Sequence, residues 1–408
     1  MIFLLAAGIL TSHTATADSF QTLHRFTGRS DGFGPYGGFV ADAAGILYGV
    51  TSAGGNFDTG LCSNGCGTIF SIRPFGGEFQ SVHKFTTTEG VSVNSPLVSG
   101  GGKILYGATF AGGPGIGTEH DSGGGTIFEF DAGSGKVTVL YTLVGTRGAL
   151  TNPNTGLTLA KGGLYGSTAF DGGGGFGGIY RFDLATRKLK TIHRWTNSAA
   201  IGGSLNSAMV VGKDGMIYGA TDLGGPKNTG MLFRIDPATQ KIAALHPVDD
   251  GKGGRASSPL TVGSDGMLYG TTAPNDTAKG SCARIGCGAV FKFDPQTLEF
   301  TILHSFTGGV DGGIPRGTTT ISANGQALFG LTTFGGAHKF GAVYRVNLAT
   351  GQLAVVHDFA GGAAGGLQQD SLPSLTRQYG MLFGATVLGG LSKACHDQGC
   401  GTAFELVP

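Results

Sequence analysis

The sequence predicts an all-β fold, a single seven-bladed β-propeller with four antiparallel strands in each blade, from three repeated motifs. A Leu-Tyr-Gly motif or a close variant recurs seven times, and it ends at Gly49, Gly107, Gly166, Gly219, Gly270, Gly330 and Gly384. Each copy is followed by a glycine with a short apolar run, as in Gly67–Phe70, and then by an apolar-His-x-aromatic motif, as in Val82–Phe85. Seven copies in one fixed order, 51 to 60 residues apart, are typical of propeller blades.

Each repeat contains four short runs of alternating apolar and polar residues, which is the pattern of β-strands. In the fifth copy these runs are Ser258–Val262, Met267–Thr272, Ala289–Asp294 and Glu299–Ser305. Turn residues separate them, because Asp and Gly favour tight turns and Asp can accept hydrogen bonds from nearby backbone. A β-solenoid has much shorter coils than this repeat, so the period favours propeller blades.

The two ends of the repeat array predict how the ring closes. The segment Phe20–Phe26 carries a fourth-strand motif before any first strand, and Gly401–Pro408 is a third strand with no fourth strand after it. We therefore expect the N-terminal strand to complete the last blade, which removes the open sheet edges of an unclosed ring. A single propeller domain is predicted over residues 18–408.

The composition excludes several classes of protein. Of 408 residues, 79 are glycine, 40% are hydrophobic and 13% are charged, and the formal net charge is +1. The apolar content is sufficient for a core, and the absence of Lys and Arg runs argues against a nucleic-acid partner. No stretch after the first ten residues is apolar enough to span a membrane. We expect a monomer.

The N-terminus has the pattern of an export signal. Ile2–Leu10 is a nine-residue apolar core, and Ala15-Thr16-Ala17 places small residues before Asp18, although no Lys or Arg precedes the core. These features predict a signal peptide over residues 1–17 and a secreted protein, periplasmic or extracellular. Six cysteines in the mature chain fit an oxidising compartment.

The repeated units resemble a known family. The units LYGVTSAGG…GTIFSI and LYGATFAGG…GTIFEF are similar to the GloVer-type tandem repeat of exported bacterial proteins. The resemblance covers residues 19–408 and supports export and a repeat architecture. It implies no shared catalytic residue, and we expect no cofactor.

The cysteines form three local couples in the loops between second and third strands of blades one, five and seven. The couples are Cys62 and Cys66, Cys282 and Cys287, and Cys395 and Cys400. In an exported protein this spacing predicts three disulfides, each within one loop. A structural zinc ion would need four converging ligands, so we expect no metal site.

Histidines recur at one position of the repeat in six blades. These are His24, His83, His193, His246, His304 and His357. A single active site cannot use six equivalent residues dispersed around a ring. We therefore expect each imidazole to bridge strands within its own blade.

The candidate functional residues are those that break the repeat. Loops between second and third strands emerge on the same face of a propeller as the loops that join consecutive blades, and such loops commonly carry recognition. Three histidines outside the repeat fall in the former loops, and arginines are expected in the latter. The predicted ligand-binding residues are His120, His338, His396, Arg147, Arg255 and Arg316.

Two classes of function remain open from these residues. The first is a binding module that holds a polysaccharide or a cell-surface protein on this face, and the cationic residues suit an acidic or hydroxyl-rich ligand. The second is a polysaccharide-degrading enzyme, a lyase or a glycoside hydrolase, with its site on the same face. No Ser-His-Asp signature, phosphate loop or HExxH motif is present. Whether the protein is an enzyme is not decided by its sequence.

Overall fold

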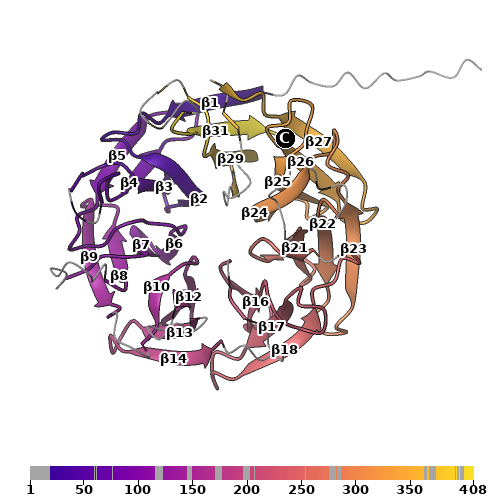
Figure 1. Ribbon diagram of the computed structural model, residues 1–408, viewed down its shortest axis with the longest axis horizontal. Coiled ribbons are helices and arrows are strands. Elements are labelled where there is room, and N and C mark those ends of the chain that lie inside the picture. Colours follow the sequence, from indigo (N-terminus) through magenta and orange to yellow (C-terminus); the bar gives the residue numbers. More distant parts are fainter. Residues whose placement is uncertain are drawn as a thin grey trace, which may run out of the picture.

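The protein is a ring of seven four-stranded blades around a central axis (Figure 1). The computed structural model describes residues 19–408 except for 59, 61, 76, 115–122, 145–148, 171–176, 196–202, 206, 253, 275–281, 283–285, 363–364, 367–373, 391, 393–394 and 396–398. In every blade the strands are antiparallel, with the first strand beside the axis and the fourth at the rim. The predicted seven-bladed propeller is confirmed.

The blades are numbered in chain order, and the strands of blades one to four are listed first. Blade one contains β2 (Phe33–Ala41), β3 (Leu47–Ala53), β4 (Thr68–Ile72) and β5 (Phe79–Lys84). Blade two contains β6 (Val98–Gly101), β7 (Ile104–Ala108), β8 (Thr126–Asp131) and β9 (Lys136–Thr142). Blade three contains β10 (Thr151–Pro153), β11 (Thr158–Ala160), β12 (Gly163–Phe170), β13 (Gly178–Asp183) and β14 (Leu189–Arg194). Blade four contains β15 (Val210–Val211), β16 (Ile217–Ala220), β17 (Met231–Ile235) and β18 (Ile242–Pro247).

Blades five to seven follow the same order, except that an N-terminal strand completes the last blade. Blade five contains β19 (Arg255–Ala256), β20 (Thr261–Val262), β21 (Leu268–Ala273), β22 (Ala289–Phe293) and β23 (Phe300–Ser305). Blade six contains β24 (Gly313–Ile321), β25 (Ala327–Phe334), β26 (Ala342–Asn347) and β27 (Leu353–Asp358). Blade seven contains β28 (Leu375–Gln378), β29 (Met381–Thr386), β31 (Thr402–Val407) and β1 (Ser19–Arg25).

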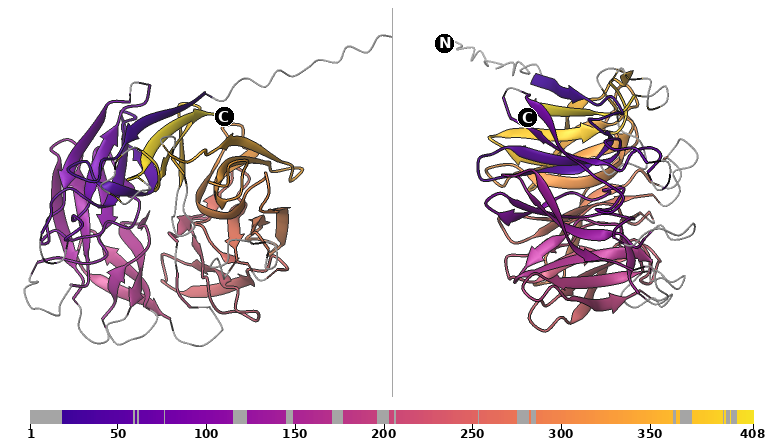
Figure 2. Two further views of the ribbon diagram at one scale, coloured as in Figure 1. Left: turned by 45° about the horizontal axis from the view of Figure 1, so that its top comes forward. Right: turned by 90° about the vertical axis from the view of Figure 1, so that its left-hand side faces the viewer.

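The ring closes through β1, as the sequence predicts. β1 pairs antiparallel with β31, with Phe20 opposite Leu406, and Figure 2 shows the two strands side by side. The backbone N–H of Phe26 continues this pairing by donating to the carbonyl of Gly401 at 3.0 Å. The rim of blade seven therefore has a full fourth strand.

Two of the repeated motifs are halves of one packing arrangement. Gly49 of the Leu-Tyr-Gly motif lies opposite Phe70 of the third-strand motif in the β3–β4 register. A Cβ atom on Gly49 would lie 2.4 Å from Cζ of Phe70, so only glycine leaves room for this ring. Gly107 and Phe128 repeat the arrangement in blade two, at 2.3 Å. Because the glycine of one motif leaves the space that the aromatic ring of the other motif fills, both motifs recur together in every blade.

The apolar side chains gather between the blades. The described residues form seven hydrophobic clusters, and each contains buried residues from two consecutive blades. The cluster between blades seven and one, for example, joins Phe26 and Phe383 to Phe39 and Phe70. Each sheet thus buries both of its faces against neighbouring sheets, which is why its strands are apolar on both sides.

Five of the six repeated histidines contact the next blade or the loop that leads to it, so the prediction that they act within their own blades is wrong for these five. His24, on the rim strand of blade seven, bonds through Nε2 to the Asp31 carboxylate at 3.0 Å in the loop that leads to blade one. Its ring also stacks on Phe79 of blade one, with centroids 3.5 Å apart. The same two kinds of contact recur elsewhere in the ring: His83 with Glu89, His304 with Asp311, His246 with Phe300 and His357 with Phe20.

The carboxylates in these pairs also hold the blade-joining turns. Asp31 accepts the backbone N–H of Thr27 at 2.9 Å, and Glu89 accepts that of Thr86 at 3.0 Å. Burial raises the pKa of Asp31, but hydrogen bonds from His24 and Thr27 outweigh it and hold that pKa below its ordinary value. Burial also raises the pKa of Glu89, but hydrogen bonds from His83 and Thr86 outweigh burial and hold that pKa below its ordinary value. The rim histidines therefore connect one blade to the next.

Closure of the ring predicts the effect of truncating Phe26, which is only 1% exposed between blades seven and one. Phe26→Ala should lower the free energy of unfolding by about 3–5 kcal/mol, because it removes a large ring from a seam that cannot collapse around the cavity. Chemical denaturation monitored by circular dichroism measures this loss. Phe57→Ala is the control, since Phe57 is 56% exposed and its truncation should change stability by less than about 0.5 kcal/mol. Equal effects of the two substitutions would contradict closure through β1.

The lowered pKa values of Asp31 and Glu89 predict an acid-sensitive ring. These two carboxylates bind protons more weakly in the folded protein than in the unfolded chain. Their contribution to the free energy of unfolding is therefore present above the unfolded-state pKa values of about 4, and it is lost as the pH falls through the lower pKa values of the folded state. Urea midpoints between pH 6 and pH 2.5 should therefore fall less steeply for an Asp31→Asn, Glu89→Gln variant than for the wild type. Glu299→Gln, at an exposed position, is the control. An unchanged slope in the double variant would show that these pairs contribute nothing to folding.

Candidate functional site

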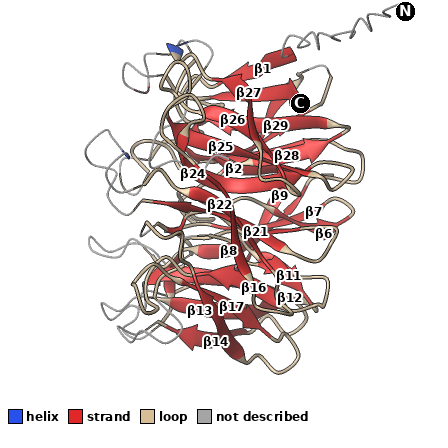
Figure 3. Ribbon diagram, turned by 90° about the vertical axis from the view of Figure 1, so that its right-hand side faces the viewer, coloured by secondary structure: helices blue, strands red, loops and turns tan. Residues whose placement is uncertain are grey.

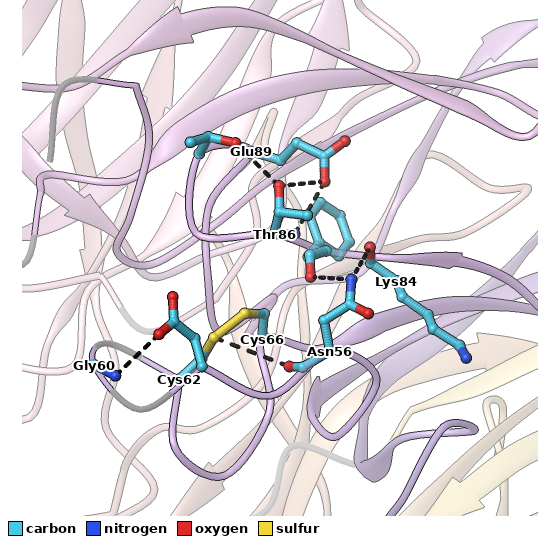
Figure 4. The surroundings of a disulfide bond; sticks show 10 residues. Asn56, Gly60, Cys62, Cys66, Lys84, Thr86 and Glu89 are labelled. Carbon is cyan, nitrogen blue, oxygen red and sulfur yellow. Dashed lines mark hydrogen bonds between the residues drawn. A yellow bond between two sulfur atoms is a disulfide. The ribbon is translucent and has the colours of Figure 1, made fainter.

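The blade-joining loops and the second-to-third-strand loops meet on one face of the disc, which Figure 3 shows edge-on. In blade one, the backbone N–H of Gly55 donates to the carbonyl of Arg29 in the preceding joining loop at 2.7 Å. The amide of Asn56 donates to the carbonyls of Lys84 and Phe85, each at 3.0 Å (Figure 4). The two kinds of loop are therefore bonded into one layer, which we call the loop face.

All six cysteines are paired within single loops of this face, as the sequence predicts. The disulfides are Cys62–Cys66, Cys282–Cys287 and Cys395–Cys400. The backbone carbonyl of the second cysteine accepts a hydrogen bond from the next blade, either from its inner strand or from the segment that precedes this strand. The donors and distances are Ser92 to Cys66 at 3.1 Å, Ile314 to Cys287 at 2.7 Å and Gly34 to Cys400 at 3.2 Å. Each disulfide thus fixes a loop at the point where that loop holds the following blade.

Of the six predicted ligand-binding residues, His120, His396 and Arg147 lie outside the described residues. His338 is exposed in the loop between β25 and β26 on the loop face. Within the described part of the chain, no hydrogen bond or ion pair joins His338 to Arg255 or Arg316.

Arg255 and Arg316 lie on inner strands, β19 and β24, and not in the joining loops where the sequence analysis placed them. These strands belong to adjacent blades. Ser257, two residues after Arg255, donates its hydroxyl to the carbonyl of Pro315 at 2.9 Å. Pro315 immediately precedes Arg316. The structure therefore brings the two arginines onto neighbouring strands at the loop-face end of the channel.

The inner strands enclose a cavity of about 30 Å³ on the central axis. All seven blades contribute to its wall, and the contributors include Tyr36, Pro96, Asn154, Ser207, Pro259, Thr318 and Ser374. Apart from Tyr36, these side chains are small or are uncharged hydroxyls and amides. We call this cavity the channel recess.

Tyr36 and Arg316 occupy the same position of the repeat. Each lies opposite the residue that follows the motif glycine, Val50 in blade one and Leu331 in blade six. Each also immediately precedes an irregularity in the pairing of its inner strand. Other blades carry different polar residues at this position, namely Asn94, Asn154 and Ser257. The repeat thus varies in chemistry at a position beside the channel.

The surroundings of Tyr36 keep its hydroxyl protonated. Burial raises the pKa of Tyr36 to about 12, and the nearby Arg316 guanidinium opposes that rise. The Tyr36 hydroxyl and the Asn94 amide make no hydrogen bonds to other described residues. Both side chains line the channel recess, so the recess offers hydrogen-bond donors to a group that enters it.

Asp222 is a candidate that the sequence analysis missed. It follows β16 of blade four, and burial raises its pKa, while the Arg255 guanidinium of blade five and a hydrogen bond with Ser204 partly oppose the increase. An alignment of the seven repeats shows that Asp222 is the one charged residue at its repeat position. The equivalent residues in the other blades are Ser52, Phe110, Ala169, Ala273, Thr333 and Val387, none of them charged. Asp222 therefore places a carboxyl group of raised pKa beside one of the predicted arginines.

No group of three or more His, Cys, Asp or Glu side chains in the described ranges is arranged to hold a metal ion. No helix among the same residues is long and apolar enough to cross a membrane.

The family model of the Gloeobacter/Verrucomicrobia repeat matches residues 6–175 and 153–404. The protein belongs to this family. The match spans all seven blades of the ring and confirms the resemblance drawn from the repeated motifs. No curated protein sequence matches the chain.

Several solved structures share the propeller fold. One is described as the extracellular domain of a one-component system from B. thetaiotaomicron (TM-score 0.59, 14% identity, 95% of this chain and 40% of that one). The present chain therefore spans about two fifths of the length of that protein. An oligogalacturonate lyase from Vibrio parahaemolyticus aligns with TM-score 0.55 and 10% identity over 96% of this chain and 97% of its own.

A third similar structure is described as a 6-phosphogluconolactonase from Bacteroides fragilis (TM-score 0.54, 17% identity, 84% of this chain and 88% of that one). At such identities these likenesses show the fold alone. The three disulfides point to an oxidising compartment, extracellular or periplasmic.

The proximity of Arg316 to Tyr36 predicts a measurable change in the tyrosine titration. Arg316→Gln should move the pKa of Tyr36 upward from about 12, because the guanidinium opposes the effect of burial. Rapid pH-jump absorbance measurements near 295 nm follow phenol ionisation, and the difference from a Tyr36→Phe variant isolates this residue. Arg345→Gln, which changes an exposed arginine of the same blade, should leave the titration unchanged. A downward shift in Arg316→Gln would contradict the arrangement.

Proposed function

We propose that the protein is an exported binding module that holds an acidic or hydroxyl-rich glycan on the loop face, around the mouth of the central channel. The observation that carries this proposal is the variation at the position of Tyr36, Asn94, Asn154, Ser257 and Arg316. Tyrosine, asparagine, serine and arginine occupy this position, and Tyr36, Asn94 and Asn154 line the channel recess. Residues on rigid strands hold such groups in fixed positions for recognition.

Export rests on the expected signal peptide over residues 1–17 and on the three disulfides, which suit an oxidising compartment. The fold also occurs in a bacterial extracellular domain. Within the proposed site, Arg255, Arg316 and His338 would contact the ligand, together with the predicted His120, His396 and Arg147. A surface protein is the other class of partner that a loop face of this kind can hold.

One observation favours an enzyme as the second candidate. Asp222 combines a raised pKa with the neighbouring Arg255, and a carboxyl group of this kind can transfer a proton in polysaccharide cleavage. The shared fold of an oligogalacturonate lyase is compatible with this alternative. A lyase or hydrolase acting at this pair would lose turnover in Asp222→Asn.

A panel of acidic and neutral polysaccharides tests both candidates with one preparation of the full mature chain. We expect calorimetric binding without unsaturated products or new reducing ends. Arg316→Ala and His338→Ala should each weaken binding by about tenfold or more, and His338→Ala should leave the melting temperature unchanged, because His338 is exposed in a loop.

Arg73→Ala is the matched control, since Arg73 is exposed in the turn between β4 and β5 on the opposite face. Binding that depends on Arg73 and not on Arg316 would overturn the assignment of the face. Product formation that disappears in Asp222→Asn would establish the enzymatic alternative.

A further inference from the structure

We propose that the channel recess binds the uncharged hydroxymethyl group of a hexose residue, with Tyr36, Asn94, Ser207 and Thr318 as its hydrogen-bond partners. This inference rests on the proposed function and names the part of the glycan that enters the channel. The sugar ring and the acidic groups of the same glycan remain outside the recess, at the loop-face mouth.

The recess is built at two levels of the inner strands. Tyr36, Asn94 and Asn154 form the upper level, nearer the loop face, because each lies four residues before the residue that pairs with the tyrosine of the Leu-Tyr-Gly motif. The lining residues two positions further along the strands form the lower level, and all of them are small: Pro96, Gly156, Ala208, Pro259, Thr318 and Ser374. Space therefore remains on the axis beneath the larger polar side chains.

Among the described residues, four polar side chains of the recess have no hydrogen-bond partner. They are the phenol of Tyr36, the amide of Asn94 and the hydroxyls of Ser207 and Thr318, which come from four different blades. Ser207 is only 8% exposed, so its hydroxyl is largely withdrawn from bulk water. A buried polar group that makes no hydrogen bond is costly, and these four groups therefore favour a ligand that bonds to them.

Other polar groups of the wall are already held in place by the protein. The amide of Asn154 donates to the carbonyl of Leu205 at 3.2 Å, and the hydroxyl of Ser374 accepts the backbone N–H of Thr318 at 3.0 Å. Both hydrogen bonds join adjacent blades. The wall is therefore fixed by contacts between blades, while the four unbonded groups are left for a ligand.

The chemistry of the wall selects an uncharged hydroxyl. The phenol, the amide and the two hydroxyls offer both donors and acceptors, and a ligand hydroxyl also donates and accepts, whereas a carboxylate only accepts and an ammonium group only donates. No residue that lines the recess in the described part of the chain is Asp, Glu, Lys, Arg or His. An ionised group would therefore lose its hydration in the recess without gaining a counter-charge.

The lower level also supplies apolar surface for a carbon atom. Pro96, Ala208 and Pro259 carry only apolar side-chain atoms, and they surround the axis together with Gly156. A hydroxymethyl group combines one methylene with one hydroxyl, so it matches a wall of mixed apolar and polar groups. This group also projects from a pyranose ring by a single bond, so it reaches into the recess while the ring stays at the mouth.

The test compares glucose, galactose and mannose with their 6-deoxy analogues, since each pair differs only in the hydroxyl of the hydroxymethyl group. Binding to the full mature chain with intact disulfides is measured by NMR titration. We expect one or more of these hexoses to bind about tenfold or more tightly than the matching 6-deoxy sugar, because the analogue leaves buried polar groups without partners.

Three substitutions remove single hydroxyls from the recess with little change in volume, namely Tyr36→Phe, Ser207→Ala and Thr318→Val. Each should weaken binding of the preferred hexose by about 3- to 10-fold and leave binding of its 6-deoxy analogue nearly unchanged. Tyr379→Phe is the matched control, because it removes a phenol hydroxyl from a 55% exposed residue in the turn between β28 and β29 on the opposite face. Thermal melting verifies that every variant is folded.

Three further outcomes separate this inference from the proposed function. Equal affinity for every hexose and its 6-deoxy analogue, with polysaccharide binding still lost in His338→Ala, would overturn the hydroxymethyl recess and leave the glycan-binding function intact. Hexose binding that depends on the 6-hydroxyl and on Tyr36, in a protein that binds no polysaccharide, would overturn the proposed function and support the recess. A crystal structure at saturating hexose in which only ordered water occupies the recess would overturn the inference.

Discussion

The packing of each blade against its two neighbours is the constraint on which the rest of this structure depends. Every hydrophobic cluster of the described residues joins two consecutive blades, so burial of one sheet requires the sheets on both sides. A blade alone would expose two apolar faces to water, and burial of apolar area is the dominant favourable contribution to folding. The glycine and aromatic motifs, the rim histidines and the closing strand β1 all serve this arrangement. The rim histidines add polar contacts to the same seams, outside the apolar clusters.

This constraint also explains why variation is concentrated around the channel and in the loops. A residue in a seam must fit two blades, whereas a residue such as Arg316 is limited mainly by the space around the axis. The inner strands of seven blades converge there, and identical repeat positions become neighbours in space. A change from tyrosine to asparagine at this position alters the chemistry of the channel, and asparagine or serine here also bonds to the next blade, as Asn154 does to the carbonyl of Leu205 and Ser257 to that of Pro315. The three disulfides have a related effect, because they fix loops whose carbonyls hold the following inner strand.

The sequence was sufficient to predict the architecture, because strands, closure and cysteine pairs all follow from the spacing of repeated motifs. It was insufficient where a side chain leaves its own blade. His24 belongs to blade seven by its position in the repeat, yet its partners Asp31 and Phe79 lie in the joining loop and in blade one. Repeat alignment identifies equivalent residues but does not indicate which neighbour they contact.

The same difference explains the outcome for the candidate site. Arg255 and Arg316 stood out as charges that break the repeat, but the short, irregular inner strands made them look like loop residues. Asp222 directly follows β16, but equivalent residues such as Ser52 lie within second strands, so the repeat pattern assigned this position to a strand. Tyr36 was not among the predicted site residues, since its neighbour Arg316 is 280 positions further along the chain and approaches it only when the ring closes.

The central claim is that the closed ring forms a site for an acidic ligand at the loop-face end of its axis. A crystal structure of the mature protein soaked with a short oligogalacturonate tests it most directly. The account predicts electron density for the saccharide at the channel mouth on the loop face, in contact with Arg316 or His338. Density confined to the opposite face or to the outer rim, with the recess unchanged, would contradict it.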